Sequence, residues 1–202
     1  MEPGLLQPPA TAGFLPVGGG CGSVVSGDGG KASSAASAAL RIAELGIRCV
    51  CFDFDLCILR IHSYGQKLTP AAVAVREPFQ ADFVDYDYFT ALVPALQARG
   101  LAVYIASFGL YEVIQKYMDR AFGKGFFTRE SISTPSVVGG VDGTSIPWGK
   151  VPQLLDIQQK LKLGKTDILF LDGAHACLLF TSGVLVLRLR MRSFAHSLLR
   201  CI

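Results

Sequence analysis

The sequence predicts an α/β domain with a Rossmann-like parallel sheet covered by helices on both faces. Three apolar runs have the length of strands, at 47–52, 101–106 and 167–171. Segments with helical periodicity separate them, at 85–99, 110–122 and 151–161. Strands buried on both faces are continuously apolar, and the long connections between these runs favour parallel pairing. The carboxyl ends of such strands share one edge of the sheet, where α/β proteins bind ligands.

The chain begins with a stretch that carries no apolar periodicity. Residues 1–30 are rich in Gly, Pro, Ala and Ser, which predicts a flexible low-complexity tail. An Ala-rich helix is expected next, over Ala32–Leu45, and Gly46 would end it as a C-terminal cap.

Local signals define further elements. Thr69-Pro70 is typical of an N-cap followed by a first-turn proline, and predicts a short helix. Pro94 lies inside the predicted helix 85–99 and is expected to kink it or to limit its first part. Residues 126–146 contain two glycine turn signals between β-prone pieces, which suits either a hairpin or a long loop.

Composition narrows the class of protein. The 202 residues suffice for one compact domain, and a net charge of +3 is too weak to indicate nucleic-acid binding. The best candidate for a membrane span, Ala176–Leu187, is too short and runs into Arg188. The start has no basic region before Lys31, which argues against a signal or transit peptide and favours a cytoplasmic protein.

Six cysteines show no spacing typical of secreted scaffolds. Cys49-x-Cys51 would place both thiols on one face of a strand, and no second cysteine pair or histidine follows at a zinc-site spacing. Buried free thiols in a reducing compartment are the favoured interpretation over a metal site.

Polar residues stand where each predicted strand ends. Asp53 follows the first strand, Ser107 the second and Asp172 the third, while Lys150 directly precedes the helix 151–161. In a parallel sheet these groups converge, and together they suit a phosphoryl group with a divalent cation. Asp55 lies two residues after Asp53, so on a strand both carboxylates would share a face, and Mg²⁺ would offset their repulsion.

The order of these residues resembles the motifs of the haloacid dehalogenase (HAD) superfamily of phosphohydrolases and phosphotransferases. CVCFDFDLCIL is similar to its first motif and LAVYIAS to its second, while Lys150 and ILFLD match the third and fourth. The resemblance covers 47–172 and implies a HAD-like domain over 31–172. It also implies a small cap insert at 60–84, followed by an atypical C-terminal segment at 173–202.

The resemblance implies a reaction as well. Asp53 would attack phosphorus and form an aspartyl-phosphate, and Asp55 would act as general acid and then as general base. Ser107 and Lys150 would bind the phosphoryl oxygens. Mg²⁺ would be held by Asp53, the backbone carbonyl of Asp55, and Asp172. The substrate would be a phosphorylated small molecule or a phosphoprotein.

Two departures from the family pattern leave a second hypothesis open. Cys57 replaces the usual Thr or Val, and the second acid expected after Asp172 is missing. The positions where that acid is expected hold Gly173, Ala176 and Cys177. The chain could therefore be a catalytically impaired or truncated domain that binds phosphate or a partner.

The end of the chain is unusual for the family. It could supply a strand at Gly183–Met191, with Arg188, Arg190 and Arg192 on one side, or be a divergent ending. A solvated strand face explains these arginines better than a nucleic-acid site, because aromatic residues are not interleaved. Trp148 would either line the mouth of the pocket or pack within its own loop. His62 and His196 have no partner at an informative spacing, so the sequence assigns them no functional role.

Overall fold

The structure, a computed structural model, describes residues 28–164, 166–173, 177–181 and 184–188. Its strands are β1 (Cys49–Phe52), β2 (Ala102–Ala106), β3 (Ile132–Ser133), β4 (Ile168–Asp172), β5 (Cys177–Thr181) and β6 (Val184–Arg188). Its α-helices are α1 (Asp28–Glu44), α2 (Pro70–Val75), α3 (Tyr86–Gln97), α4 (Tyr111–Phe122) and α5 (Val151–Leu161). Among the described residues, no helix is both long and apolar enough to cross a bilayer.

The six strands form one sheet in the order β3-β2-β1-β4-β6-β5. All neighbouring pairs are parallel except β5 and β6, which pair antiparallel. Strand β1 lies between β2 and β4, so Phe52 is in register with both Ile105 and Leu171. The predicted parallel α/β fold is confirmed, and the polar residues that follow these three strands lie at one edge.

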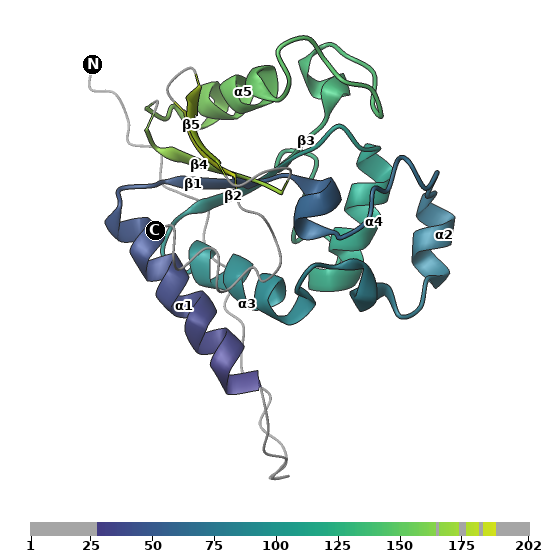
Figure 1. The fold of residues 1–202 in the computed structure, drawn as a ribbon, viewed down its shortest axis with the longest axis horizontal. Helices are drawn as coiled ribbons and strands as arrows, with labels where there is room; N and C mark the ends of the chain where they lie inside the picture. The colour runs from purple at the N-terminus through teal and green to yellow at the C-terminus, as the bar shows by residue number, and fades with distance from the viewer. Residues whose placement is uncertain (1–27, 165, 174–176, 182–183, 189–202) are drawn as a thin grey trace, which may run out of the picture.

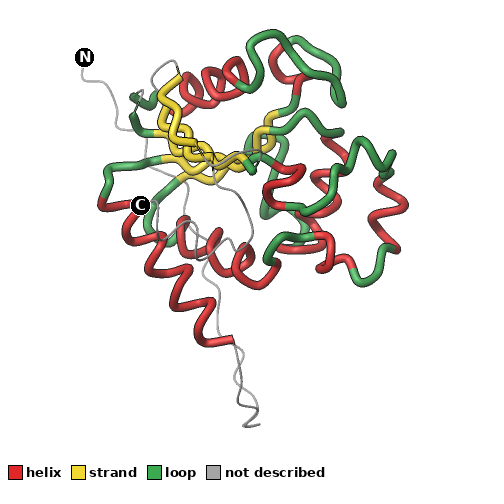
Figure 2. Tube along the Cα trace, in the orientation of Figure 1, coloured by secondary structure: helices red, strands yellow, loops and turns green. Residues whose placement is uncertain are grey.

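Helices cover both faces of the sheet (Figures 1 and 2). Cys49 and Cys51 of β1 pack in one cluster with Leu154 and Ile157 of α5. Val50 and Phe52 belong to the larger cluster on the opposite face, which includes residues of α1, α3 and α4. This alternation follows from the two-residue period of a strand and makes each face of β1 a core.

Helix α1 starts earlier than the sequence predicted. It begins at Asp28, so residues 28–30 of the predicted tail are helical, and residues 1–27 lie outside the described part. Lys31 pairs with Asp85 at 2.8 Å and Asp87 at 3.2 Å, which fixes the first turns against α3. The sequence of the tail carries no signal for this start.

One local prediction in the next helices is confirmed. The Oγ1 atom of Thr69 accepts a hydrogen bond from the amide of Ala72, and Pro70 opens α2. Helix α3 contains Pro94 and continues past it to Gln97, so Pro94 does not end the helix, and the kink expected at this residue stays a prediction.

The segment 60–84 is closed at its base and bound to α4. Leu59 and Phe83 form an antiparallel bridge beside its ends. Within it, the buried carboxylate of Asp82 accepts hydrogen bonds from Arg76 and, at 2.6 Å, from the hydroxyl of Tyr117 in α4. Burial and this hydrogen bond raise the pKa of Tyr117, so the phenol remains a donor over the whole physiological range. Whether the segment acts as a cap remains a prediction.

The hairpin expected as one option for 126–146 is wrong. Strand β3 pairs parallel with β2, and the rest is a long connection with a 3₁₀ turn at Pro135–Val138. The signals at Gly139-Gly140 and Asp142-Gly143 do not produce a hairpin. The β-prone piece before them forms β3, which pairs with β2 at the edge of the sheet and not with the next piece of the chain.

The strand predicted within Gly183–Met191 is present as β6, and β5 was not predicted. Both belong to the single apolar run 177–187, in which Ser182-Gly183 was the available turn signal. Arg190, Arg192 and His196 lie outside the described residues.

Among the residues whose side chains the structure describes, Cys49, Cys51 and Cys57 are buried free thiols, as predicted for Cys49 and Cys51. Burial raises the pKa of the Cys49 thiol to about 12, and raises those of Cys51 and Cys57 well above the ordinary value. We expect all three to resist iodoacetamide in the native protein at mildly alkaline pH, because the thiolate is the reactive species. Peptide mass spectrometry with and without guanidinium measures this, and native-state labelling of Cys49 would contradict the packing against α5.

Candidate active site

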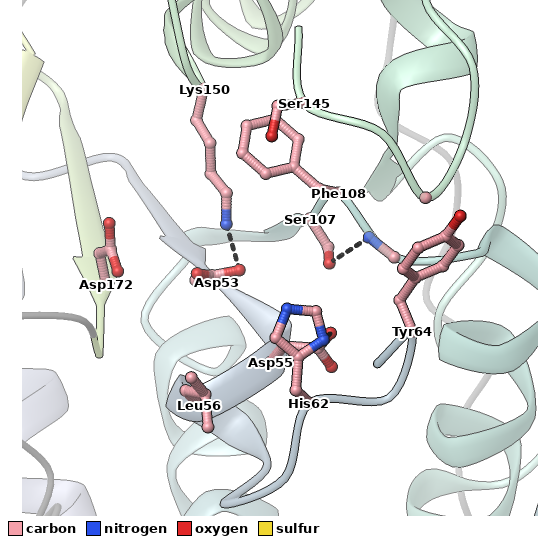
Figure 3. A pocket seen from close by; sticks show the side chains of 12 residues that line it. Asp53, Asp55, Leu56, His62, Tyr64, Ser107, Phe108, Ser145, Lys150 and Asp172 are labelled. Atoms are coloured by element: carbon pink, nitrogen blue, oxygen red, sulfur yellow. Dashed lines mark hydrogen bonds and ion pairs between the residues drawn. The ribbon is translucent and has the colours of Figure 1, made fainter. Parts of the chain in front are cut away.

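A cavity of about 290 Å³ lies at the carboxyl ends of β1, β2 and β4 (Figure 3). The structure brings all five predicted site residues into it, although they come from four separate stretches of the chain. The lining consists of Asp53, Asp55, Leu56, His62, Tyr64, Ser107, Phe108, Gly109, Gly143, Ser145, Lys150 and Asp172. Trp148 is 85 % exposed and is not part of this lining.

Asp53 lies directly after β1 and is fixed by three contacts. Its backbone amide donates to the carbonyl of Leu171 in β4, at 2.8 Å. Its Oδ1 accepts a 2.6 Å hydrogen bond from the amide of Phe54 and forms an ion pair with Lys150 Nζ. Both side-chain contacts engage Oδ1, and neither engages Oδ2.

The Asp53–Lys150 pair is largely shielded from water. The two side chains are 14 % and 12 % exposed, and the Lys150 ammonium also lies 5.2 Å from the ring centre of Phe108. Lys150 is the residue from which α5 starts, so the helix position determines where its ammonium lies. The Lys150 ammonium therefore lies at the carboxyl ends of the strands, as the sequence predicted.

The pKa of Asp53 is raised mainly by burial, which penalises the carboxylate. Lys150 acts in the opposite direction, and the negative charge of Asp172 raises the pKa further. The like-charge repulsion at this site is therefore between Asp53 and Asp172, on neighbouring strands. The expectation that Asp53 and Asp55 repel each other on one strand face is wrong, because β1 ends at Phe52.

Asp55 lies in an irregular turn, Phe54–Ile58, that redirects the chain after β1 and in which Asp55 itself has an extended backbone, with φ −70° and ψ 134°. Leu56 has a left-handed backbone with φ 58°, an uncommon conformation for a leucine. The turn gives Asp55 its own partners: Oδ1 accepts from the amide of Ser63 at 3.0 Å, and Oδ2 lies 3.2 Å from Nδ1 of His62.

His62 is a site residue that sequence reasoning missed. Its Nδ1 lies 3.1 Å from the Gly65 amide, which donates to it, and the ring lines the cavity beside Asp55 (Figure 3). The segment 60–84 has no spacing signal that links His62 to Asp55. The two aspartates thus have different neighbours, an ammonium for Asp53 and an imidazole for Asp55, and this is how paired carboxyl groups acquire separate roles.

Ser107 is buried just after β2 and is held by a glutamine on α5. Its Oγ accepts a 3.0 Å hydrogen bond from the amide of Gly109. Gln153 Nε2 donates to the carbonyls of Ser107 at 2.9 Å and Ser133 at 2.8 Å. One fully buried side chain therefore connects the ends of β2 and β3 to the helix that starts at Lys150.

We expect Gln153→Leu to destabilise the protein by about 1–3 kcal/mol, because the carbonyl of Ser107 loses its side-chain donor in a buried site. The control is Gln159→Leu on the exposed face of the same helix, expected to change stability by less than about 0.5 kcal/mol. Urea unfolding of both variants gives the comparison. Equal stabilities would mean that Gln153 does not hold the strand ends.

Asp172 is the last residue of β4, and Gly173 follows it in tight contact with the turn Phe54–Ile58. A Cβ atom at Gly173 would lie 1.8 Å from the carbonyl oxygen of Leu56 and 3.0 Å from the Cα of Cys57. With the present backbone, any side chain at this position, including that of an acid, would overlap the turn.

The donor set of the cavity is compatible with Mg²⁺, although it is small. The described residues contain no group of three His, Cys, Asp or Glu side chains that could hold a metal ion. Mg²⁺ is commonly held by one or two carboxylates, with water and phosphate oxygens completing the shell. Asp53 and Asp172 supply two carboxylates whose mutual repulsion a cation would relieve.

Comparison of the chain with known protein families, curated proteins and solved structures found no match.

Proposed function

We propose that this chain is a phosphohydrolase that cleaves a phosphate monoester through an aspartyl-phosphate on Asp53. The observation that carries the proposal is the placement of a buried carboxylate at the end of the central strand, ion-paired with Lys150 and in one cavity with Ser107 and Asp172. The motif order that resembles the HAD superfamily supports the same assignment.

In the first step Oδ2 of Asp53 attacks phosphorus, and the bond from phosphorus to the ester oxygen breaks. Oδ1 is held by Phe54 and Lys150, which orients the other oxygen toward the substrate. Lys150 and the Ser107 hydroxyl bind the non-bridging phosphoryl oxygens. Asp55, whose Oδ1 accepts a hydrogen bond from the Ser63 amide, gives its proton to the departing alkoxide.

In the second step Asp55 takes a proton from water, and the hydroxyl oxygen attacks phosphorus. The bond between phosphorus and Oδ2 breaks, which releases inorganic phosphate and restores the Asp53 carboxylate. Asp53 and Asp172 would hold Mg²⁺ beside the phosphate, where it would neutralise charge on the phosphoryl oxygens. The backbone carbonyl of Asp55 is a further proposed ligand.

The alternative function is a domain that binds phosphate without turning it over. The specific observation behind it is the tight contact of Gly173 with Leu56, which leaves Asp172 without an acidic neighbour at the next position. A weak metal site would leave Lys150 and Ser107 able to bind a phosphate that Asp53 does not attack.

Trapping the aspartyl-phosphate distinguishes the phosphohydrolase from the phosphate-binding domain. In Asp55→Asn the base for the second step is missing, while an aryl phosphate needs little help from an acid because its leaving group is stable. We expect this variant to lose about 10²- to 10⁴-fold in turnover and to accumulate protein heavier by one phosphoryl group, measured by intact-mass spectrometry. The mass increase should be absent from the double variant that also carries Asp53→Asn. Unmodified Asp55→Asn protein under turnover conditions would favour the binding domain.

A further inference from the structure

A second cavity, of about 430 Å³, borders the candidate active site. It is lined by Tyr64, Gly65, Lys67, Leu68, Thr69 and Leu110. Tyr64 lines both cavities, and Gly109 of the first is followed in the chain by Leu110 of the second. The two cavities therefore adjoin at Tyr64 and at the connection after β2.

The Tyr64 ring marks the boundary between them. A Cβ atom at Gly143 would lie 2.1 Å from Cε2 of this ring, so Tyr64 packs closely against a glycine of the facing loop. In Figure 3 the ring lies across the cavity from Asp172, with His62 and Asp55 between them. A group leaving the phosphorus on the side of Asp55 would pass along Tyr64.

The chemistry of the two linings differs. The first cavity has three aspartates, a lysine, a histidine and two serines beside the apolar side chains of Leu56 and Phe108. The second has the ring of Tyr64 with Leu68 and Leu110, and no acidic side chain. Lys67 is its charged member, and the methylene stem of a lysine adds apolar surface. Ligand sites commonly combine an apolar wall with a few polar groups that fix orientation.

We propose that the second cavity binds the organic part of the substrate, and that the substrate is a phosphate monoester of an apolar alcohol carrying a ring. This inference rests on the proposed function, because it takes the phosphate to lie between Lys150 and Ser107. The ring lies against Tyr64 and contacts Leu68 and Leu110, and the ester oxygen faces Asp55.

Binding of non-hydrolysable phosphonates tests the proposal apart from catalysis. Isothermal titration calorimetry with the full chain and Mg²⁺ compares phenylphosphonate with methylphosphonate. We expect the phenyl compound to bind about tenfold more tightly, since only its ring reaches the second cavity. The preference should persist in Tyr64→Phe, which keeps the ring, and should fall toward unity in Tyr64→Ala and Leu110→Ala. Circular dichroism of each variant verifies that it is folded.

Each remaining outcome overturns the proposal in a distinguishable way. If the wild-type chain bound both phosphonates with equal affinity, the proposed apolar subsite would be refuted, and the proposed phosphate site would still stand. A phenyl preference that persists in both Tyr64→Ala and Leu110→Ala would place the ring elsewhere. Failure of both phosphonates to bind would overturn the phosphate site and the proposed function together.

Discussion

Asp53→Asn is expected to lower the hydrolysis of an aryl phosphate by roughly 10⁴-fold or more, because the amide cannot serve as the attacking oxygen nucleophile. Asparagine has nearly the same shape, so the loss would report on the chemistry and not on the filling of the site. Initial rates with Mg²⁺, and with the ion removed by a chelator, measure both the nucleophile and the cation requirement. The wild-type rate should fall without Mg²⁺.

The matched control is Asp87→Asn, the same change on the exposed side of α3, outside the cavity lining. Its rate should equal that of the wild-type chain. Retained turnover in folded Asp53→Asn would refute the covalent mechanism. No turnover in the folded wild-type chain would leave the binding domain as the function to pursue.

Gly173→Asp is expected to destabilise the protein by about 3 kcal/mol, or roughly 6–12 °C in Tm, and to leave the Mg²⁺ dependence no stronger. The substitution places a second acid directly after Asp172, where the proposed resemblance to the HAD superfamily would expect one. A side chain at this position would overlap the carbonyl oxygen of Leu56, and the atoms in the way are backbone atoms that cannot rotate aside. Thermal unfolding of the purified variant measures the effect.

The control for this prediction is Gly30→Ala in α1, where a new Cβ has nothing within 4 Å. It should raise stability by up to about 1 kcal/mol, because alanine favours a helix over glycine. If Gly173→Asp were as stable as the wild-type chain and gained activity with Mg²⁺, the site would have room for the second acid. The overlap inferred at position 173 would then be wrong.

The sequence by itself determined the five described α-helices, the strands β1, β2 and β4, and their order. Helix α5 has the predicted bounds, Val151–Leu161, and β1, β2 and β4 lie within or at the ends of the predicted apolar runs. Such features depend on residues that are close in the chain. The apolar period distinguishes strands from helices, Thr69 caps the start of α2, and Gly46 and Gly100, both with positive φ, follow the ends of α1 and α3. The parallel arrangement then placed Asp53, Ser107 and Asp172 at one edge of the sheet without further information.

Only the tertiary structure decided what each polar group contacts. The sequence contains no signal that pairs Asp55 with His62, or that has Gln153 join the ends of β2 and β3. It likewise indicated repulsion between Asp53 and Asp55, whereas the neighbouring strands set Asp53 against Asp172. Periodicity and caps are local and therefore readable along the chain. Ion pairs, buried hydrogen bonds and the close approach at Gly173 depend on distances between segments that only the folded chain brings together.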